Sequence, residues 1–190
     1  MPFRLLGLTA HPDQAGHLCG RAFARYSRGG THTTLVCVTG HGYASGAARS
    51  IGRRLGLTDI VLLDYKSGEA EAIDLANVFT DLMSSLRPHV VVADRAQPVV
   101  WEAAHAAFER VRRQGGGSAA LPAKLYYRPG ADGNAIPVTA AVATSQPEAP
   151  ELFVRAFPSP WVTGVLERDL FAGVPLNPVG ALDLGDRLAS

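Results

Sequence analysis

Apolar and polar residues are arranged along the chain in blocks that predict strands and helices in turn. Short apolar or β-branched runs predict buried strands at 3–10, 31–39, 59–65 and 89–93. Apolar residues at helical spacing predict a helix from Leu18 to the glycines at 29–30, and further helices over 47–55, 69–86 and 98–113. The apolar face expected for the helix over 69–86 comprises Ile73, Ala76, Val78, Phe79, Leu82 and Met83.

This alternation indicates the fold class. Strands that are apolar on both faces and joined by helices are typical of a parallel sheet that is covered on both sides. The pattern therefore predicts an α/β protein with a Rossmann-like three-layer sandwich and a mostly parallel sheet.

The pattern changes after residue 113. The glycine-rich stretch 114–118 predicts a flexible link, and 124–128 and 138–142 predict two strands separated by a turn at 129–134. The segment 151–157 predicts one more strand, and the remainder is rich in Pro and Gly. We expect a single domain over 1–190, with a βα core at 1–113 and C-terminal strands and an irregular tail at 114–190.

Composition narrows the range of partners and compartments. The 190 residues are 47% apolar and 18% charged, with a net charge of +1, so no nucleic acid or anionic membrane is expected as a partner. No run approaches the ~18 apolar residues of a membrane span, and 5–10 is too short for a secretory signal. Cys19 and Cys37 lie in apolar segments, which predicts buried, reduced thiols and a cytoplasmic location.

The ends of the predicted strands are the expected place for a ligand. Parallel sheets bind ligands beyond the carboxyl ends of their strands, near a reversal in strand order. The polar residues at these ends are His11, Asp13 and Gln14, then Thr39 and His41, then Asp64 and Tyr65, and finally Asp94, Arg95 and Gln97.

Three common kinds of site are excluded because the sequence lacks their motifs. The turn after the first strand, HPDQAGH at 11–17, has one glycine and does not fit a dinucleotide-binding loop. A phosphate-binding loop of the Walker type and a serine nucleophile elbow are also absent from the sequence. A histidine and an aspartate two positions apart therefore remain as the main chemical signal.

Five separated segments resemble the PIG-L/LmbE-like family of zinc-dependent N-acetylglucosamine deacetylases. AHPDQAGHLCG at 10–20 and LVCVTGHG at 35–42 are similar to the family's first two strand ends. RRLGLTDIVLLDYKSGE at 53–69 and SLRPHVVVADR at 85–95 are similar to its third and fourth strands, and LERDLFAGV at 166–174 to a late family motif. The resemblance implies the LmbE-like deacetylase fold.

The resemblance also implies a chemistry. In the family a zinc ion held by His, Asp and His polarises the acetyl carbonyl and activates a water molecule, while a second Asp accepts the proton of that water. Carried over by position, His11 matches the first zinc ligand and Asp13 the general base.

The other expected zinc donors are replaced. Gln14 stands where the second ligand is expected, and Val100 stands where the third is expected, in QPVV at 97–100. The late histidine of the family is replaced by Ala143 in ATSQ at 143–146. One imidazole and a neutral amide make a poor zinc site, so the substitutions predict that catalytic zinc is absent.

Three functional hypotheses follow. In the first, the chain is a degenerate family member that is not an enzyme and acts as a binding or interaction protein, with a small sugar-like ligand, because the amides of Gln14 and Gln97 suit sugar hydroxyls. In the second, it is an active hydrolase of an N-acylated sugar or related amide that uses His11 and Asp13, with a zinc site relocated to His41 and Asp94 or Asp64. In the third, it is a Rossmann-like module that binds a small molecule or a partner and has no link to sugars. His17 and His105 are expected to be ordinary helical residues.

Three further features leave alternatives open. Arg49, Arg53 and Arg54 could contact an anion or form a solvated helix face. A homo-oligomer is expected only by analogy with the family. The chain is also short for this family, which predicts a shallow cleft.

Overall fold

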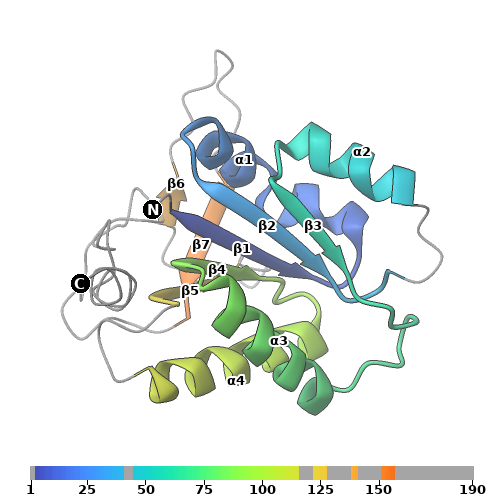
Figure 1. Cartoon of the computed structure of the whole chain (residues 1–190), viewed down its shortest axis with the longest axis vertical. Coiled ribbons are helices and arrows are strands. Elements are labelled where there is room, and N and C mark those ends of the chain that lie inside the picture. Colours follow the sequence, from blue (N-terminus) through green and yellow to red (C-terminus); the bar gives the residue numbers. More distant parts are fainter. Residues whose placement is uncertain (1–2, 41–44, 116–121, 128–137, 141–150, 157–190) are drawn as a thin grey trace, which may run out of the picture.

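The computed structural model describes residues 3–40, 45–115, 122–127, 138–140 and 151–156. These residues form a sheet with helices on both of its faces (Figure 1). The elements, in chain order, are β1(Arg4–Thr9), η1(Pro12–Gln14), α1(Ala15–Arg28), β2(His32–Cys37), α2(Ser45–Leu55), β3(Asp59–Leu62), α3(Ala72–Leu86), β4(Val90–Ala93), α4(Pro98–Gln114), β5(Lys124–Tyr127), β6(Val138–Ala140) and β7(Glu151–Arg155).

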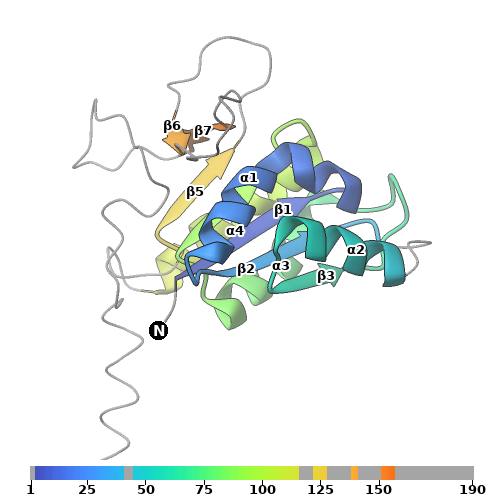
Figure 2. The same ribbon diagram turned by 90° about the horizontal axis from the view of Figure 1, so that it is seen from above.

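The sheet has the strand order β3-β2-β1-β4-β5-β7-β6. The first five strands are parallel, with Gly7 of β1 opposite Leu35 of β2 and Val92 of β4. β7 pairs antiparallel with β5 and with β6, so the C-terminal strands extend one edge of the sheet (Figure 2). The chain builds outward from β1 to β3 and then crosses to β4, which puts the reversal in strand order between β1 and β4.

The helices form two outer layers. α1 and α2 lie on one face of the sheet, and α3 and α4 lie together on the other (Figure 1). Each face has its own buried apolar cluster. The predicted three-layer α/β sandwich with a mostly parallel sheet is therefore confirmed, whereas the division at residue 113 stays a prediction.

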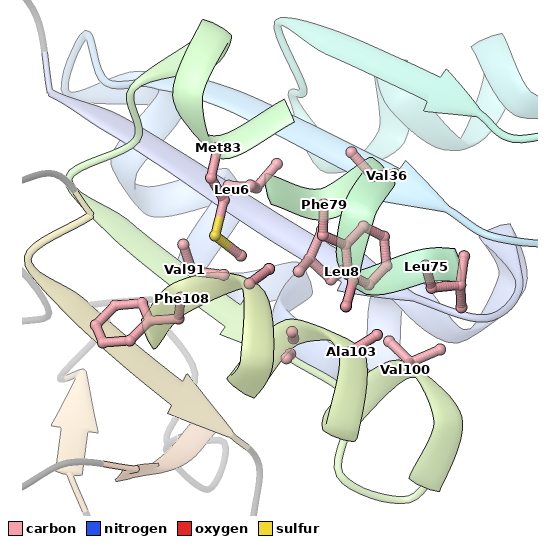
Figure 3. Packing of buried hydrophobic residues seen from close by; sticks show 14 of the residues in the cluster. Leu6, Leu8, Val36, Leu75, Phe79, Met83, Val91, Val100, Ala103 and Phe108 are labelled. Carbon is pink, nitrogen blue, oxygen red and sulfur yellow. The ribbon is translucent and has the colours of Figure 1, made fainter. Parts of the chain in front are cut away.

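The apolar cluster beneath α3 and α4 fills the space between these helices and the sheet. It joins the sheet residues Leu6, Leu8 and Val91 to α3 and α4. Figure 3 shows this packing from close by. The helical residues labelled there are Leu75, Phe79, Met83, Val100, Ala103 and Phe108.

Two predictions about α3 were wrong. The helix begins at Ala72 rather than near residue 69, because Gly68 has φ +82° and Glu71 is an extended N-cap residue. Ile73 is 56% exposed, while Leu75 is buried. Leu75, Phe79 and Met83 recur every four residues and form the buried stripe, and Ile73 lies about 200° around the helix from Leu75, as follows from 3.6 residues per turn.

A buried histidine lies just before β4. His89 is 1% exposed, its Nδ1 accepts a hydrogen bond from the backbone N–H of Arg4 at 3.2 Å, and its ring meets Phe3 edge-on. Its Nε2 has no hydrogen-bond partner in the part of the chain that the structure describes. Burial, and then the Arg4 charge, lower the pKa of His89 to about 4, so the ring is neutral at physiological pH.

In the described ranges, no helix combines the length and the apolar composition that crossing a membrane requires.

Candidate functional site

The turn after β1 is organised by Gln14. Pro12 fixes the first residue of η1, and His11 before it is extended, with φ −128° and ψ 146°. The Gln14 side-chain oxygen accepts hydrogen bonds from the backbone N–H of His11 at 3.1 Å and from the Thr9 hydroxyl at 3.3 Å. The backbone N–H of Gln14 donates to the His11 carbonyl oxygen at 3.1 Å. The oxygen at the expected second ligand position therefore holds the turn.

Val100, at the expected third ligand position, belongs to the hydrophobic core. It lies in the first turn of α4, is 3% exposed, and packs in the same cluster as Leu8 and Leu75 (Figure 3). The neighbouring Val99 is 39% exposed. The first turn of α4 therefore directs position 100 towards the sheet face and α3.

Asp13 lies on the other face of the sheet, beside α2. It is exposed and lines a pocket of about 210 Å³ between the start of α1 and α2. The other lining residues are Pro12, Gly16, Ile51, Arg54 and Leu55. The residue expected to match the general base thus lines a pocket whose other wall is α2.

The Asp13 carboxylate acts on a buried thiol, that of Cys37. Burial of Cys37, at the end of β2, raises the pKa of its thiol to about 12, and the Asp13 carboxylate adds to the effect. A thiol with this pKa stays protonated and is a poor nucleophile or metal ligand. Cys19 is also buried, and neither cysteine forms a disulfide.

The end of β2 is tied to its neighbours through the backbone. The Thr39 N–H donates to the Ala10 carbonyl at 2.8 Å, and Thr39 forms an isolated antiparallel bridge with Asp64. The Gly40 N–H donates to the Leu63 carbonyl at 2.7 Å. A Cβ atom at position 40 would lie 2.5 Å from that oxygen, so only glycine fits this approach. His41, the predicted replacement ligand, lies outside the described residues.

The loop after β4 is closed by Asp94. Its N–H donates to the Leu8 carbonyl at 3.1 Å, and one carboxylate oxygen accepts a hydrogen bond from the Ala96 N–H at 3.0 Å. Gln97 is the N-cap residue of α4, but its side chain makes no capping hydrogen bond. The Arg95 guanidinium lies 4.6 Å from the Tyr127 ring centre, which is a cation–π contact.

The predicted residues therefore separate into distinct groups. Asp13 faces α2, Val100 is in the core with α3, and Asp94 shapes the β4–α4 loop. His17 and His105 lie on helices, as expected. Within the ranges that the structure describes, no group of three or more His, Cys, Asp or Glu residues could hold a metal ion.

These residues do not fit the zinc site that the resemblance implies. A catalytic zinc needs three protein donors around an open position. Of the three expected positions, His11 offers an imidazole, Gln14 uses its oxygen locally, and Val100 has no donor atom.

The sequence does not identify the α2 side of the pocket as a site. There, Arg54 is one of three basic residues that could contact an anion or form a solvated helix face. Ile51 and Leu55 are four residues apart and share a helix face, which forms the pocket wall together with Arg54. That spacing is the signal in the sequence from which this wall could have been predicted.

A larger pocket, of about 460 Å³, lies at the opposite edge of the sheet. It is lined by the amino ends of β1, β2 and β3 and by the end of α3, and it includes Arg4 and a His32–Asp59 pair joined at 2.8 Å. Ligands of parallel sheets bind at the carboxyl edge, so the Asp13 pocket is the candidate site despite its smaller volume.

Comparisons with known proteins identify the fold. No protein-family model and no curated protein matches the chain. The solved structures that it resembles include GalB, the 4-carboxy-2-hydroxymuconate hydratase of Pseudomonas putida, at 16% identity and a TM-score of 0.54. They also include a conserved protein of Thermus thermophilus, at 23% identity and 0.54, and N,N'-diacetylchitobiose deacetylase of Pyrococcus horikoshii, at 18% and 0.51.

The aligned part is a portion of each molecule. It covers 66%, 67% and 65% of this chain in the three comparisons, in that order. The chain spans 65%, 66% and 59% of the lengths of those proteins, which is less than two thirds. These likenesses, together with the parallel sheet and its two helical layers, show that the chain has the LmbE-like deacetylase fold.

Proposed function

We propose that the chain is a divergent member of the LmbE-like family that binds a small ligand at the carboxyl edge of its sheet without catalytic zinc. The observation that carries this proposal is that the side chains at the two substituted ligand positions, 14 and 100, are engaged within the fold. Gln14 has its side-chain oxygen hydrogen-bonded to His11 N–H and the Thr9 hydroxyl, and Val100 is buried in the core. Both positions have structural roles that do not require a metal.

The site keeps groups suited to binding. Asp13 and Arg54 line a pocket at the strand ends, and His11 precedes it in the same turn. Two of the solved structures with this fold are named as a sugar deacetylase and a hydratase of a carboxylated substrate. A small sugar-like ligand remains the ligand predicted by the resemblance.

A zinc measurement tests the proposal. The protein is purified without chelators, its zinc content is measured by plasma mass spectrometry, and zinc binding is titrated by calorimetry for the wild type and His11→Ala. We expect substoichiometric zinc and the same weak binding in both proteins, because one imidazole without a second and third donor holds zinc poorly. His17→Ala is the control, since His17 is an exposed residue of α1.

The competing hypothesis is an active hydrolase with a relocated zinc site that includes His41. It predicts one zinc per chain that is lost in both His11→Ala and His41→Ala but kept in His17→Ala. That result, together with release of acetate from an N-acetylated sugar, would overturn the proposal.

Location and assembly remain part of the proposal. Cys19 and Cys37 are buried and are not joined in a disulfide, which supports the reducing, cytoplasmic compartment predicted from the sequence. We expect no nucleic-acid or membrane partner on the basis of the balanced charge. A homo-oligomer is carried over from the family resemblance alone.

A further inference from the structure

We infer that the pocket between the start of α1 and α2 binds a small zwitterion, with an ammonium group on Asp13 and a carboxylate on Arg54. This inference rests on the proposed function and names the ligand class of the same site. The pocket is lined by one acidic and one basic side chain, and its other walls are Pro12, Gly16, Ile51 and Leu55.

The two charges are available to a ligand. Both residues are exposed, and no nitrogen of Arg54 lies within 4.0 Å of an oxygen of Asp13. Among the described residues, no hydrogen bond or ion pair engages either charged group. A ligand that enters the pocket therefore meets a carboxylate and a guanidinium that do not neutralise each other by direct contact.

The shape of the pocket limits the size of the ligand. Its volume of about 210 Å³ is below the roughly 300–1,000 Å³ of sites for drug-sized molecules. Ile51 and Leu55 are partly buried and lie one helical turn apart, so they form an apolar wall on α2. Such a pocket suits a ligand with a short apolar middle.

Charge matching selects the class of ligand. When a ligand displaces water, every charge left without a partner raises the free energy of the complex. A ligand with only a negative charge would pair with Arg54 but would also face the Asp13 carboxylate. A ligand with only a positive charge would pair with Asp13 but would also face the Arg54 guanidinium. A neutral sugar would leave both charges without an ionic partner, whereas a zwitterion pairs with both.

The apolar wall of the pocket favours ω-amino acids within this class. In these molecules the ammonium and the carboxylate stand at opposite ends of a short methylene chain, which matches a pocket with two charged side chains and an apolar wall on α2. The methylene groups between the charges would lie against Ile51 and Leu55.

An amide NMR titration tests the inference on the full chain. The probes are β-alanine, γ-aminobutyrate and δ-aminovalerate, with butyrate and butylamine as ligands that have one charge only. We expect at least one ω-amino acid to shift the amide signals of 13–16 and 51–55. Butyrate and butylamine should bind at least about tenfold more weakly, since each lacks one of the two charged contacts.

Matched variants locate the binding. Arg54→Gln and Asp13→Asn are expected to weaken binding of the zwitterion about tenfold or more. Arg53→Gln is the control, because Arg53 is an exposed neighbour that does not line the pocket.

A filling variant tests the cavity itself. Gly16 is the second residue of α1, lines the pocket, and has open space around a Cβ, so Gly16→Leu should block the pocket without disturbing the fold. Gly46 is the second residue of α2, has the same open space, and does not line the pocket. We expect Gly16→Leu to abolish binding and Gly46→Leu to leave it unchanged, with equal thermal melting temperatures.

The outcomes separate this inference from the function on which it rests. The absence of shifts with all three ω-amino acids, or equal binding of butyrate and γ-aminobutyrate, overturns the inference. If glucosamine or N-acetylglucosamine shifts these amides and the ω-amino acids do not, the inference fails and the proposed metal-free binding function stands. Stoichiometric zinc lost in His11→Ala would instead overturn the proposed function.

Discussion

Positions 14 and 100, two of the three expected ligand positions, lie in different kinds of surroundings. On one side of β1, Gln14 is polar, partly exposed, and bonded to the turn that it closes. On the other side, Val100 is buried among apolar residues between the sheet and α3. A position in the core is closed to a ligand by packing, whereas a position in an exposed turn keeps hydrogen-bonding capacity at the rim.

The largest expected effect comes from placing a histidine at position 100. Val100→His should lower the free energy of unfolding by about 4 kcal/mol, because it overfills the core and buries a polar ring without a partner. Urea unfolding followed by circular dichroism measures this loss. Val99→His is the control, since Val99 is 39% exposed, and it should change stability by no more than about 0.5 kcal/mol. Equal losses in the two variants would show that position 100 is not a core position.

The next effect concerns His89, a polar residue that is buried inside the fold. Its pKa is about 4 in the folded chain and about 6.5 when unfolded, so the unfolded state binds more protons between these values. Stability should therefore be complete above pH ~6.5 and fall as the pH drops towards ~4, by about 3 kcal/mol in total.

Unfolding in urea at a series of pH values measures the His89 contribution. His89→Asn is the matched variant, because its side chain can still accept the Arg4 N–H hydrogen bond but does not titrate in this range. Its stability should be nearly flat over the same window. An unchanged pH slope in His89→Asn would assign the loss to other groups.

The smallest expected effect separates the two glutamines at the rim. Gln14→Leu removes the acceptor of two hydrogen bonds, from His11 N–H and from the Thr9 hydroxyl, and should lower stability by about 1–2 kcal/mol. Gln97→Leu should change it by less than about 0.5 kcal/mol, because the Gln97 side chain makes no capping hydrogen bond. Thermal melts of both variants measure the difference, and the reverse order of losses would contradict the role given to Gln14.

The layout of the sheet could be predicted from the sequence because it depends on local patterns. β-branched runs such as 31–39 and the helical spacing of Leu18 and Ala22 each indicate one element, and the alternation of elements indicates the fold. The substitution of Val100 at an expected ligand position was likewise readable from the family resemblance.

The contacts that each side chain makes could not be predicted in the same way. The direction of the Gln14 oxygen depends on Thr9 and His11 being brought together by the turn, and the exposure of Ile73 depends on which stripe of α3 meets the sheet. The pocket beside Asp13 depends on the docking of α2, an element about 40 residues further along the chain. These are tertiary contacts, which local periodicity does not specify.

The close approach at Gly40 has a consequence for engineering the rim of the site. Because a Cβ atom there would lie 2.5 Å from the Leu63 carbonyl oxygen, a saturation library at position 40 should yield folded protein almost only with glycine. Position 16 has open space on the same rim and should accept most side chains. Directed evolution of this site therefore has one position that cannot vary and, within reach of the same pocket, one that can be varied freely.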